Sequence, residues 1–494
     1  MRDDQRGPQT TALLRTLALE TVAGVLSWRH YQGLPTLPPA PDVASSHVTG
    51  DEAANAWPRV SIIIPARDEA HRLPALLASL RALDYPDYEV IVVDDNSTDA
   101  TAAVAKAGGA RVFAGQPLPL GWTGKAFACH QGALAAAGAW LLFADADTAH
   151  APASLRAAIH YALRERLDAL SLLTGQRCES AAERLLLPLA YAVLFAGVSP
   201  RRTNGRPSPQ RSSPPTAGQP SPPPPLPTAG QPSPPPHADP SLGSAEPTAQ
   251  PALPTAGEGS NGARSLAGGS PGSADVPSVP SLDQGRANSA ASATRSRTSL
   301  GVSRASDGPR GRSTAASAPL ANGQYILCRV ETYQRAGGHR AVRGSVIEDA
   351  ALARLLVRSG AAYRLCRGES VVGVRMYGSL GEVWAGFRKN AARYVLDDPR
   401  RLPGTALYSA TLGSTLPLLL RAILARRRSA LALAALNYAI ATALLTPWYR
   451  RFGVPSGYAA LHPLGVALFG LITADSAWRV VARRGASWKG RTYR

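Results

Sequence analysis

The chain has 494 residues, which is enough for more than one domain and a non-globular segment. Its 53 Lys and Arg residues against 34 Asp and Glu residues give a formal net charge of +19, which favours nucleic acid, an anionic membrane surface or a phosphorylated ligand as partner. The four cysteines show no C-x-x-C spacing and no pairing with histidine, which argues against a zinc site or a disulfide framework and favours a reducing compartment.

An apolar stretch, Thr11 to Trp28, lies near the N-terminus and is interrupted by Arg15 and Glu20. It is short for a membrane span of about 20 residues, so a transmembrane, an interfacial and a soluble helix all remain open. No small-residue cleavage site follows it, so we do not interpret it as a signal peptide. Pro35 to Pro41 predict an extended linker, and we assign residues 1–57 to a membrane-proximal segment and linker.

Apolar strands alternate with helical periodicity between residues 58 and 199. The predicted strands are Val60–Ile64, Glu89–Val93, Trp140–Phe143 and Ala169–Thr174, and the predicted helices are Asp68–Ala82, Asn96–Ala107, Ala126–Ala137 and Pro152–Arg166. This alternation predicts an α/β fold with a parallel sheet and right-handed crossovers. Ligands of such sheets bind at the carboxyl ends of the strands.

Polar residues follow three of these strands at that edge: Pro65 to Glu69, Asp94 with Asp95, and Asp145 with Asp147. Two carboxylates at spacing i, i+2 suit a hard cation such as Mg²⁺ or Mn²⁺, which completes its shell with substrate phosphates. Taken alone, such a motif is more often a solvated turn whose aspartates cap a helix. The three strand ends together predict one polar crevice.

Four segments together resemble family 2 glycosyltransferases with the GT-A fold: VSIIIPARDEA, VIVVDDNSTDAT, GWTGKAFACHQGALAAAG and LLFADADT. Members of that family are inverting enzymes that use nucleotide-diphospho-sugars. The resemblance covers Arg59 to about Ser180 and resumes at Ala321.

The resemblance implies a role for each matching residue. Pro65, Arg67 and Glu69 are expected to line the nucleotide site, Asp95 to hydrogen-bond the nucleobase, and Asp147 with Asp145 to hold a divalent cation on the diphosphate. Lys125 follows a Gly-rich loop that lacks the full Walker spacing. It is placed to neutralise phosphate charge, and a surface lysine at a helix N-terminus is the alternative.

The composition changes at Pro200, and residues 200–319 contain no aromatic residue. Pro, Ser, Ala, Gly and Thr dominate, and PTAGQPSPPP occurs twice. Such a segment cannot bury enough apolar surface to offset its ordering entropy, so we expect a disordered insertion with polyproline II tendency. A proline-rich ligand role is the less favoured alternative.

Residues 320–378 resume the α/β domain, and Gln324 is assigned to substrate binding. Glu348 and Asp349 open a predicted helix. The family resemblance makes Asp349 the catalytic base and gives Glu348 an orienting role, whereas two acids at a helix N-terminus are the plain alternative. The Q-x-x-R-W pentapeptide of processive members is absent near Arg375, which argues against synthesis of a long polymer.

Residues 379–403 contain a predicted amphipathic helix, Leu380–Leu396, with Arg388 and Lys389 opposite its apolar face. Three segments of nearly spanning length follow within residues 404–494: Gly404–Leu424, Ser429–Tyr449 and Tyr458–Trp478. Their flanks are basic, yet three spans cannot place every flank on the cytoplasmic side. The first segment, with Pro417 and Arg421, is our candidate for a re-entrant or interfacial one.

Four further segments resemble bacterial glycosyltransferases that act on isoprenoid lipids, such as carotenoid and hopene-associated ones: PLGWTGKAFACHQG, ANGQYILCR, RMYGSLGEVWAGFRKN and SWKGRTYR. The expected function is transfer of a sugar from a nucleotide-diphospho-sugar to a lipid hydroxyl with inversion. We expect a multi-pass protein of the cell membrane with a cytoplasmic catalytic domain and no nucleic-acid partner. A nucleotidyltransferase with a similar α/β domain and a basic nucleic-acid-binding membrane protein are the alternatives.

Overall fold

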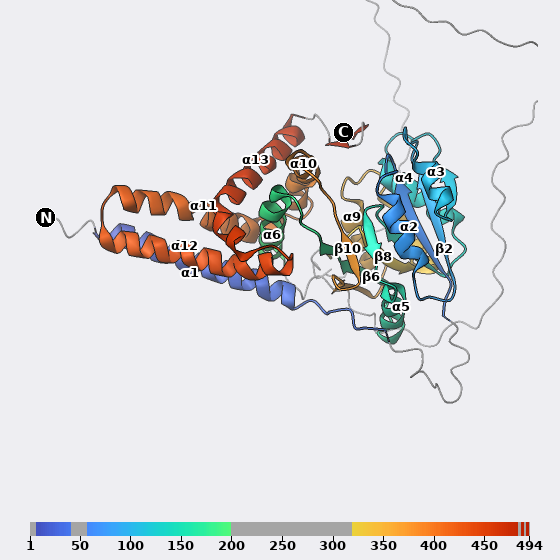
Figure 1. Cartoon of the computed structure of the whole chain (residues 1–494), viewed down its shortest axis with the longest axis horizontal. Coiled ribbons are helices and arrows are strands. Elements are labelled where there is room, and N and C mark those ends of the chain that lie inside the picture. The colour runs from blue at the N-terminus through green and yellow to red at the C-terminus, as the bar shows by residue number, and fades with distance from the viewer. Residues whose placement is uncertain (1–5, 41–56, 199–318, 483–485, 489–490, 494) are drawn as a thin grey trace, which may run out of the picture. The chain divides into compact units, whose positions relative to one another are not determined.

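The structure is a computed structural model that describes residues 6–40, 57–198, 319–482, 486–488 and 491–493 (Figure 1). The insertion expected at 200–319 therefore lies outside the described residues, except for residue 319. The catalytic sheet and the long apolar helices belong to one compact unit of the chain.

The central element is a seven-stranded sheet with the strand order β3-β2-β1-β4-β8-β6-β9. Its strands are β1 (Val60–Ala66), β2 (Tyr88–Asp94), β3 (Arg111–Ala114), β4 (Trp140–Ala144), β6 (Ala169–Leu173), β8 (Tyr325–Arg329) and β9 (Tyr363–Arg367). All neighbouring pairs are parallel except those of β8, which runs antiparallel to both β4 and β6. The predicted α/β class is confirmed, and the four predicted strands, which are β1, β2, β4 and β6, run parallel to one another. The antiparallel strand β8 was not among the predicted strands.

The reversal of β8 follows from where the chain re-enters the sheet. Asn322 lies against the carboxyl-terminal part of β6, where its backbone N–H donates to Ser171 Oγ (2.9 Å) and its side-chain amide donates to the Leu172 carbonyl (3.0 Å). Tyr325 at the start of β8 then pairs with Ala144 at the end of β4. A strand that starts at this edge has to run against its neighbours, and residues 322–324 consequently lie at the carboxyl edge.

Both faces of the sheet are buried, as the long apolar strands require. Ile62 and Ile64 of β1 pack in the core that contains the buried leucines of α2, whereas Ile63 between them packs with Cys129 of α4 on the opposite face. The helices of the α/β domain are α2 (Leu73–Arg81), α3 (Thr101–Ala107), α4 (Gly124–Ala135), α5 (Ser154–Arg164), α6 (Ala181–Ala196), α7 (Val330–Ala336), α8 (Gly338–Ala341) and α9 (Glu348–Arg358).

Smaller elements complete the domain. A three-stranded sheet has the order β5-β10-β7, and two short strands pair near the C-terminus. Their bounds are β5 (Thr148–His150), β7 (Gly175–Gln176), β10 (Val372–Val374), β11 (Ala486–Trp488) and β12 (Arg491–Tyr493).

Two predicted helix starts and one strand end differ from the structure for local reasons. Asp68 and Asn96 both adopt positive φ angles (52° and 56°), which cannot continue a right-handed helix, so α2 and α3 begin only at Leu73 and Thr101. Pro65 lies inside β1 rather than after it, in register with Val93 of β2. Pairing of β1 with β4 ends at Ile63. Pro65, which has no backbone N–H, therefore does not interrupt the hydrogen bonds between these two strands.

The remaining helices are long and apolar, and three of them are long and apolar enough to cross a membrane: Pro399–Leu424, Arg428–Arg451 and Ser456–Val481. They contain the short 3₁₀ helices η4 (Pro399–Arg401) and η5 (Ser456–Leu461) and the helices α11 (Leu402–Leu424), α12 (Arg428–Arg451) and α13 (His462–Val481). The helix α10 (Leu380–Leu396) precedes them and packs on α13.

The N-terminal apolar stretch forms the helix α1 (Arg6–Gln32), which runs beside α12 (Figure 1). The segment expected to be a linker packs on the catalytic domain instead of spanning a gap. Leu34 and Leu37 are buried, and Thr36 forms a parallel bridge to Arg367 at the end of β9. This contact extends the sheet edge and attaches α1 to the catalytic domain.

Candidate active site

A single cavity of about 730 Å³ connects the carboxyl edge of the sheet with the apolar helices. Its polar end contains all the residues assigned from sequence to a site: Pro65, Arg67, Glu69, Asp95, Lys125, Asp145, Asp147, Gln324, Glu348 and Asp349. Its other end is lined by side chains of α6, α10, α11 and α13. The structure thus brings the predicted site residues together on one wall and adds a second wall whose residues were not assigned to the site from the sequence.

Lys125 is the electrostatic centre of the polar end. Its ammonium lies 2.7 Å from Asp145 Oδ1 and 3.0 Å from Glu348 Oε1. Burial works against the charge, yet the three surrounding carboxylates raise the pKa of Lys125 well above its usual value. The position at the start of α4 thus directs the Lys125 side chain into the acidic cluster, and the assignment of Lys125 to the substrate site stays a prediction.

Glu348 and Asp349 are adjacent in the sequence but differ in ionisation. Burial alone would raise both pKa values, but Lys125 beside Glu348 lowers the pKa of Glu348 to about 2. For Asp349, burial and then the Glu348 charge raise the pKa to about 6, against the opposing effect of Lys125. One neighbouring acid is thereby fixed as an anion and the other is held near the pH at which a general base works best.

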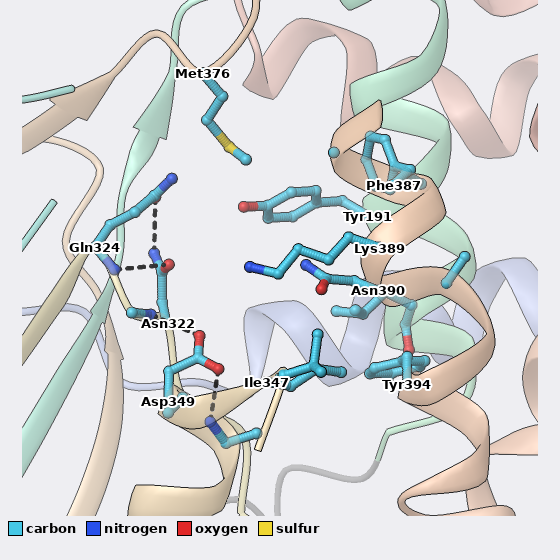
Figure 2. Close-up of a pocket in the computed structure, with 18 of the residues that line it drawn as sticks. Tyr191, Asn322, Gln324, Ile347, Asp349, Met376, Phe387, Lys389, Asn390 and Tyr394 are labelled. Atoms are coloured by element: carbon cyan, nitrogen blue, oxygen red, sulfur yellow. Dashed lines mark hydrogen bonds between the residues drawn. The ribbon is translucent and has the colours of Figure 1, made fainter. Parts of the chain in front are cut away.

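Two backbone N–H groups orient the Asp349 carboxylate. Gly323 donates to Oδ2 at 2.8 Å and Ala350 donates to Oδ1 at 2.7 Å. A Cβ at position 323 would lie 3.0 Å from Asp349 Oδ2 and 3.1 Å from Lys125 Nζ, so a larger residue there would have to displace these two side chains by a few tenths of an ångström. The re-entry segment of β8 and the start of α9 therefore jointly aim Asp349 into the cavity (Figure 2).

Asp147 carries a buried carboxylate of the kind that can bind a hard cation. Its Oδ1 atom is buried and has no hydrogen-bond partner, and burial followed by the charge of Asp145 raises its pKa to about 7. Among the residues that the structure describes, no group of three or more His, Cys, Asp or Glu side chains is arranged to hold a metal. The two aspartates suit Mg²⁺ or Mn²⁺ only if the remaining ligands come from substrate oxygens or water.

The opposite part of the polar end is built from the loops after β1 and β2. Arg67 donates through Nη1 to the Asp95 carbonyl (2.7 Å), and the Asp95 N–H donates to the Ala66 carbonyl (2.7 Å). Glu69 pairs with Arg72 (3.2 Å). These bonds join the two loops into one surface on which the side chain of Asp95 is buried at the cavity wall.

The side chain of Gln324 forms hydrogen bonds with residues on the same side of the cavity. Its amide oxygen accepts hydrogen bonds from Thr174 Oγ1 and from Asn322 Nδ2 (3.1 Å). It is buried and lines the cavity, so its assignment to substrate binding stays a prediction.

The residues of the helical wall were not assigned to the site from the sequence, although one quoted motif, RMYGSLGEVWAGFRKN, contains Lys389. Figure 2 shows Tyr191 from α6 and Lys389 from α10 pointing across the cavity toward Asn322 and Gln324. The expectation that Arg388 and Lys389 form a separate polar face of α10 is wrong for Lys389, which lines the cavity. Arg388 pairs with Asp475 of α13 (3.7 Å). The run Arg388-Lys389-Asn390 inside an apolar helix was the available signal.

Comparison with known proteins agrees with this geometry. Residues 61–185 match the family described as Glycosyl transferase family 2. Two curated relatives are 4,4'-diaponeurosporenoate glycosyltransferases, from Staphylococcus haemolyticus (strain JCSC1435; 44% identical over 90 residues) and Staphylococcus aureus (strain MRSA252; 44% over 89 residues). Each match covers 18% of this chain and only 24% of the relative.

Solved structures of glycosyltransferases are also similar. The mannosyltransferase PcManGT from Pyrobaculum calidifontis in complex with GDP-Man and Mn²⁺ has a TM-score of 0.43 at 14% identity and covers 98% of this chain and 100% of its own. Glucosyl-3-phosphoglycerate synthase from Mycobacterium tuberculosis in complex with Mn²⁺ and UDP-glucose has a TM-score of 0.23 at 26% identity, over 29% of this chain and 52% of its own. The resemblance to family 2 glycosyltransferases seen in the sequence is thus confirmed over residues 61–185, about a quarter of the chain, and the sheet has the α/β class expected from the sequence.

Proposed function

We propose that the protein is a membrane-associated glycosyltransferase that moves a sugar from a nucleotide-diphospho-sugar to a hydroxyl of an isoprenoid-type lipid, with inversion at the anomeric carbon. The observation that carries the proposal is the continuous cavity, which has carboxylates at one end and apolar helices at the other. A site of this kind suits an acceptor with a polar reacting end and a long apolar body. The curated relatives, which are named for a carotenoid-type acceptor, support the same class.

The donor would occupy the polar end, at the loops after β1, β2 and β4. Asp95 would accept hydrogen bonds from the nucleobase, beside Pro65, Arg67 and Glu69. The diphosphate would then reach the aspartates after β4, with Lys125 nearby as a positive charge. This placement follows the general rule that ligands of open α/β sheets bind at the carboxyl ends of the strands.

A divalent cation fits this end of the cavity. Asp147, with its unpartnered buried oxygen, and Asp145 would hold it, and the donor diphosphate would supply further oxygens. When bound, such an ion would offset the negative charge of the leaving nucleoside diphosphate. Lys125 would have to share Asp145 with the ion, since its ammonium lies 2.7 Å from Oδ1.

Asp349 would act as the general base. Its carboxylate takes the proton of the acceptor hydroxyl while that oxygen forms the bond to the anomeric carbon. The bond from the anomeric carbon to the diphosphate breaks in the same step, and its electron pair leaves with the nucleoside diphosphate. Attack opposite the leaving group inverts the configuration. Glu348, held ionised by Lys125, would keep that lysine in place.

The reaction is tested with purified protein, a lipid extract and labelled nucleotide-diphospho-sugars. The proposal requires a labelled lipid and equimolar release of nucleoside diphosphate. Release of pyrophosphate from a nucleoside triphosphate would identify a nucleotidyltransferase instead. Salt-sensitive binding of DNA without binding of any nucleotide sugar would favour a nucleic-acid-binding protein. Comparing lipids of cells with and without the protein would identify the natural acceptor.

A further inference from the structure

We infer that α13 does not cross the bilayer but is a re-entrant helix, which enters and leaves on the face that carries the catalytic domain, and that α1 crosses in its place. Length and composition alone favour α11, α12 and α13 as the three spans. The contacts between the helices point to α1, α11 and α12. The partner that covers their outer faces is the hydrocarbon of the bilayer.

The α11–α12 hairpin defines the direction across the membrane. Arg451 at the end of α12 pairs with Glu369, in the turn between β9 and β10, at 2.6 Å. At the start of α11, a Cβ on Gly404 would lie 2.3 Å from the carbonyl oxygen of Ala196, at the end of α6. The start of α11 and the end of α12 therefore lie at the catalytic domain, and the turn at residues 425–427 lies at the far end (Figure 1).

The first residue of α13 lies deep inside this hairpin. His462 forms a hydrogen bond with Thr415 of α11 (2.9 Å), and Tyr438 of α12 donates to the carbonyl of Ala460 (2.5 Å). Thr415 follows the start of α11 by 13 residues and Tyr438 precedes the end of α12 by 13 residues. At a rise of about 1.5 Å per residue, both positions lie about 20 Å along their helices from the catalytic end. A hydrocarbon core is about 30 Å thick, so α13 begins inside it.

The chain between α12 and α13 is long enough to reach this depth. Residues 452–461 include the 3₁₀ helix η5, whose six residues descend about 12 Å at a rise of about 2.0 Å each. The four residues before it span at most about 14 Å when extended, so the segment is long enough to descend from the catalytic face. A spanning α13 would instead have to start at a membrane surface.

The last turns of α13 return to the catalytic face. Trp384 of α10 donates to Asp475 Oδ2 (2.9 Å), and the backbone N–H of Ala392 donates to Ser476 Oγ (3.0 Å). Lys389, on the same helix α10, lines the polar cavity. Asp475 is 13 residues beyond His462, or about 20 Å along the axis of α13, which runs obliquely to α11 and α12 (Figure 1). The bonds of Asp475 and Ser476 to α10 place this end of the helix at the catalytic face.

The helix α1 has the contacts and the surface of a crossing segment. Its 27 residues measure about 40 Å. Leu13 packs with Ala422 and Ala434 at the far end of the hairpin, and Tyr31 hydrogen-bonds Arg451 (2.6 Å) at the catalytic end. The helix thus accompanies α11 and α12 over their full length.

One of the two charged residues that lower the hydropathy of α1 is hidden from lipid. Glu20 is fully buried beside Asn437 and Tyr408, as expected for a carboxyl group inside a helix bundle. Most of its outward side chains are apolar, and five of them are 42–56% exposed: Leu14, Leu19, Val22, Val25 and Leu26. Arg15 is also exposed, but it precedes Tyr31 by 16 residues and so lies about 24 Å from the catalytic end, where its long side chain can reach the far surface of the bilayer. Such a surface matches the bilayer core rather than water.

The re-entrant path of α13 also places the apolar end of the cavity next to the bilayer. Val466, Phe469, Gly470 and Thr473 of α13 line it while lying between the bilayer interior and α10. If the proposed function holds, the lipid acceptor enters from the leaflet next to the catalytic domain. The path itself does not depend on that function.

The test uses single cysteines, with Cys178→Ser as background because the other three native cysteines are buried. Full-length protein in sealed vesicles of known orientation is treated with a membrane-impermeant maleimide, before and after addition of detergent. The variants are Thr10→Cys, Arg427→Cys, Arg450→Cys and Val481→Cys, and Leu134→Cys on the surface of α4 marks the catalytic side. Leu134 and Val481 are 73% and 76% exposed, so both positions accept a cysteine without loss of packing.

The inference predicts labelling of positions 450, 481 and 134 from one side, and of positions 10 and 427 from the other. Labelling of position 481 from the side opposite to 450, or only after detergent, would overturn the re-entrant path. Labelling of position 10 together with 134 would show that α1 does not cross. Sugar transfer by each variant is measured separately, so loss of the proposed function and loss of this topology are distinguishable.

Discussion

Replacing Asp349 by Asn tests whether Asp349 is a catalytic base or an acid that only stabilises the N-terminus of a helix. The amide cannot accept the acceptor proton, so the chemical step should slow by about 10²–10⁴-fold, the usual contribution of general base catalysis. If Asp349 served only the helix terminus, the substitution would cost about 0.3–1 kcal/mol of stability and catalysis would survive. The role as base therefore predicts a slower transfer rate, whereas the role at the helix terminus predicts only a lower stability.

The hydrogen bonds of Asp349 set the expected side effect. Its two oxygens accept from Gly323 and Ala350, and an asparagine can satisfy only one of these two N–H groups. An unsatisfied buried N–H costs about 1–3 kcal/mol, partly offset because a neutral amide avoids the cost of a buried charge. We expect a moderately destabilised but folded variant whose donor affinity is nearly unchanged, because the proposed donor contacts lie on Asp95 and Asp147.

The assay compares sugar transfer to lipid, binding of nucleotide sugar and thermal unfolding in the same preparations. Asp168→Asn is the matched control, since Asp168 is also buried and also accepts a backbone N–H, from Ala362 (3.0 Å), but does not line the cavity. This control should lose stability and keep the transfer rate of its folded fraction. Near-parental transfer by Asp349→Asn would refute the assignment of the base.

Four further predictions follow from the same site and from the helices. Asp147→Ala should abolish transfer and weaken metal-dependent nucleotide binding in a titration with Mn²⁺, and unchanged binding would remove Asp147 from the site. Burial raises the pKa of Asp349 to about 6, and a base acts only when it is ionised. The rate of transfer at saturating metal should therefore fall about tenfold from pH 7 to pH 5. A rate that does not change over this range would contradict the prediction. The protein should stay with membranes in high salt, since apolar spans and not surface charge hold it, and release by salt alone would show peripheral binding. Deleting residues 204–314, which lie outside the described residues, should leave membrane-bound transfer largely intact, because their composition cannot form a core, and loss of folding would show a structural role.

Local sequence signals predicted the catalytic half of the molecule well. The strand of Val60 to Ile64 and the acidic residues after β2 and β4 follow from short-range patterns, because strand ends and their polar residues are adjacent in the chain. The carboxyl ends of neighbouring parallel strands have to meet at one edge, so Asp95 and Asp147 lie at the same cavity. The sequence by itself therefore determined the α/β class and which residues gather at the polar end.

Only the tertiary structure decided how that end works. The direction of β8 depends on where the chain returns to the sheet after a long insertion, and no local pattern encodes this. It places the Gly323 N–H at Asp349, and contacts over more than 200 residues place Lys125 at Glu348. The pKa values of these acids are set by burial and by those charges, which exist only after folding.

The same distinction applies to the helices. Hydropathy identified three spans in α11, α12 and α13 and left α1 open, because it counts Arg15 and Glu20 without knowing what they face. Packing shows Glu20 buried between helices and His462 bonded deep inside the α11–α12 hairpin. Apolar length determines which helices are able to enter a bilayer, whereas the partners of their polar groups, fixed by tertiary contacts, determine which of them cross it.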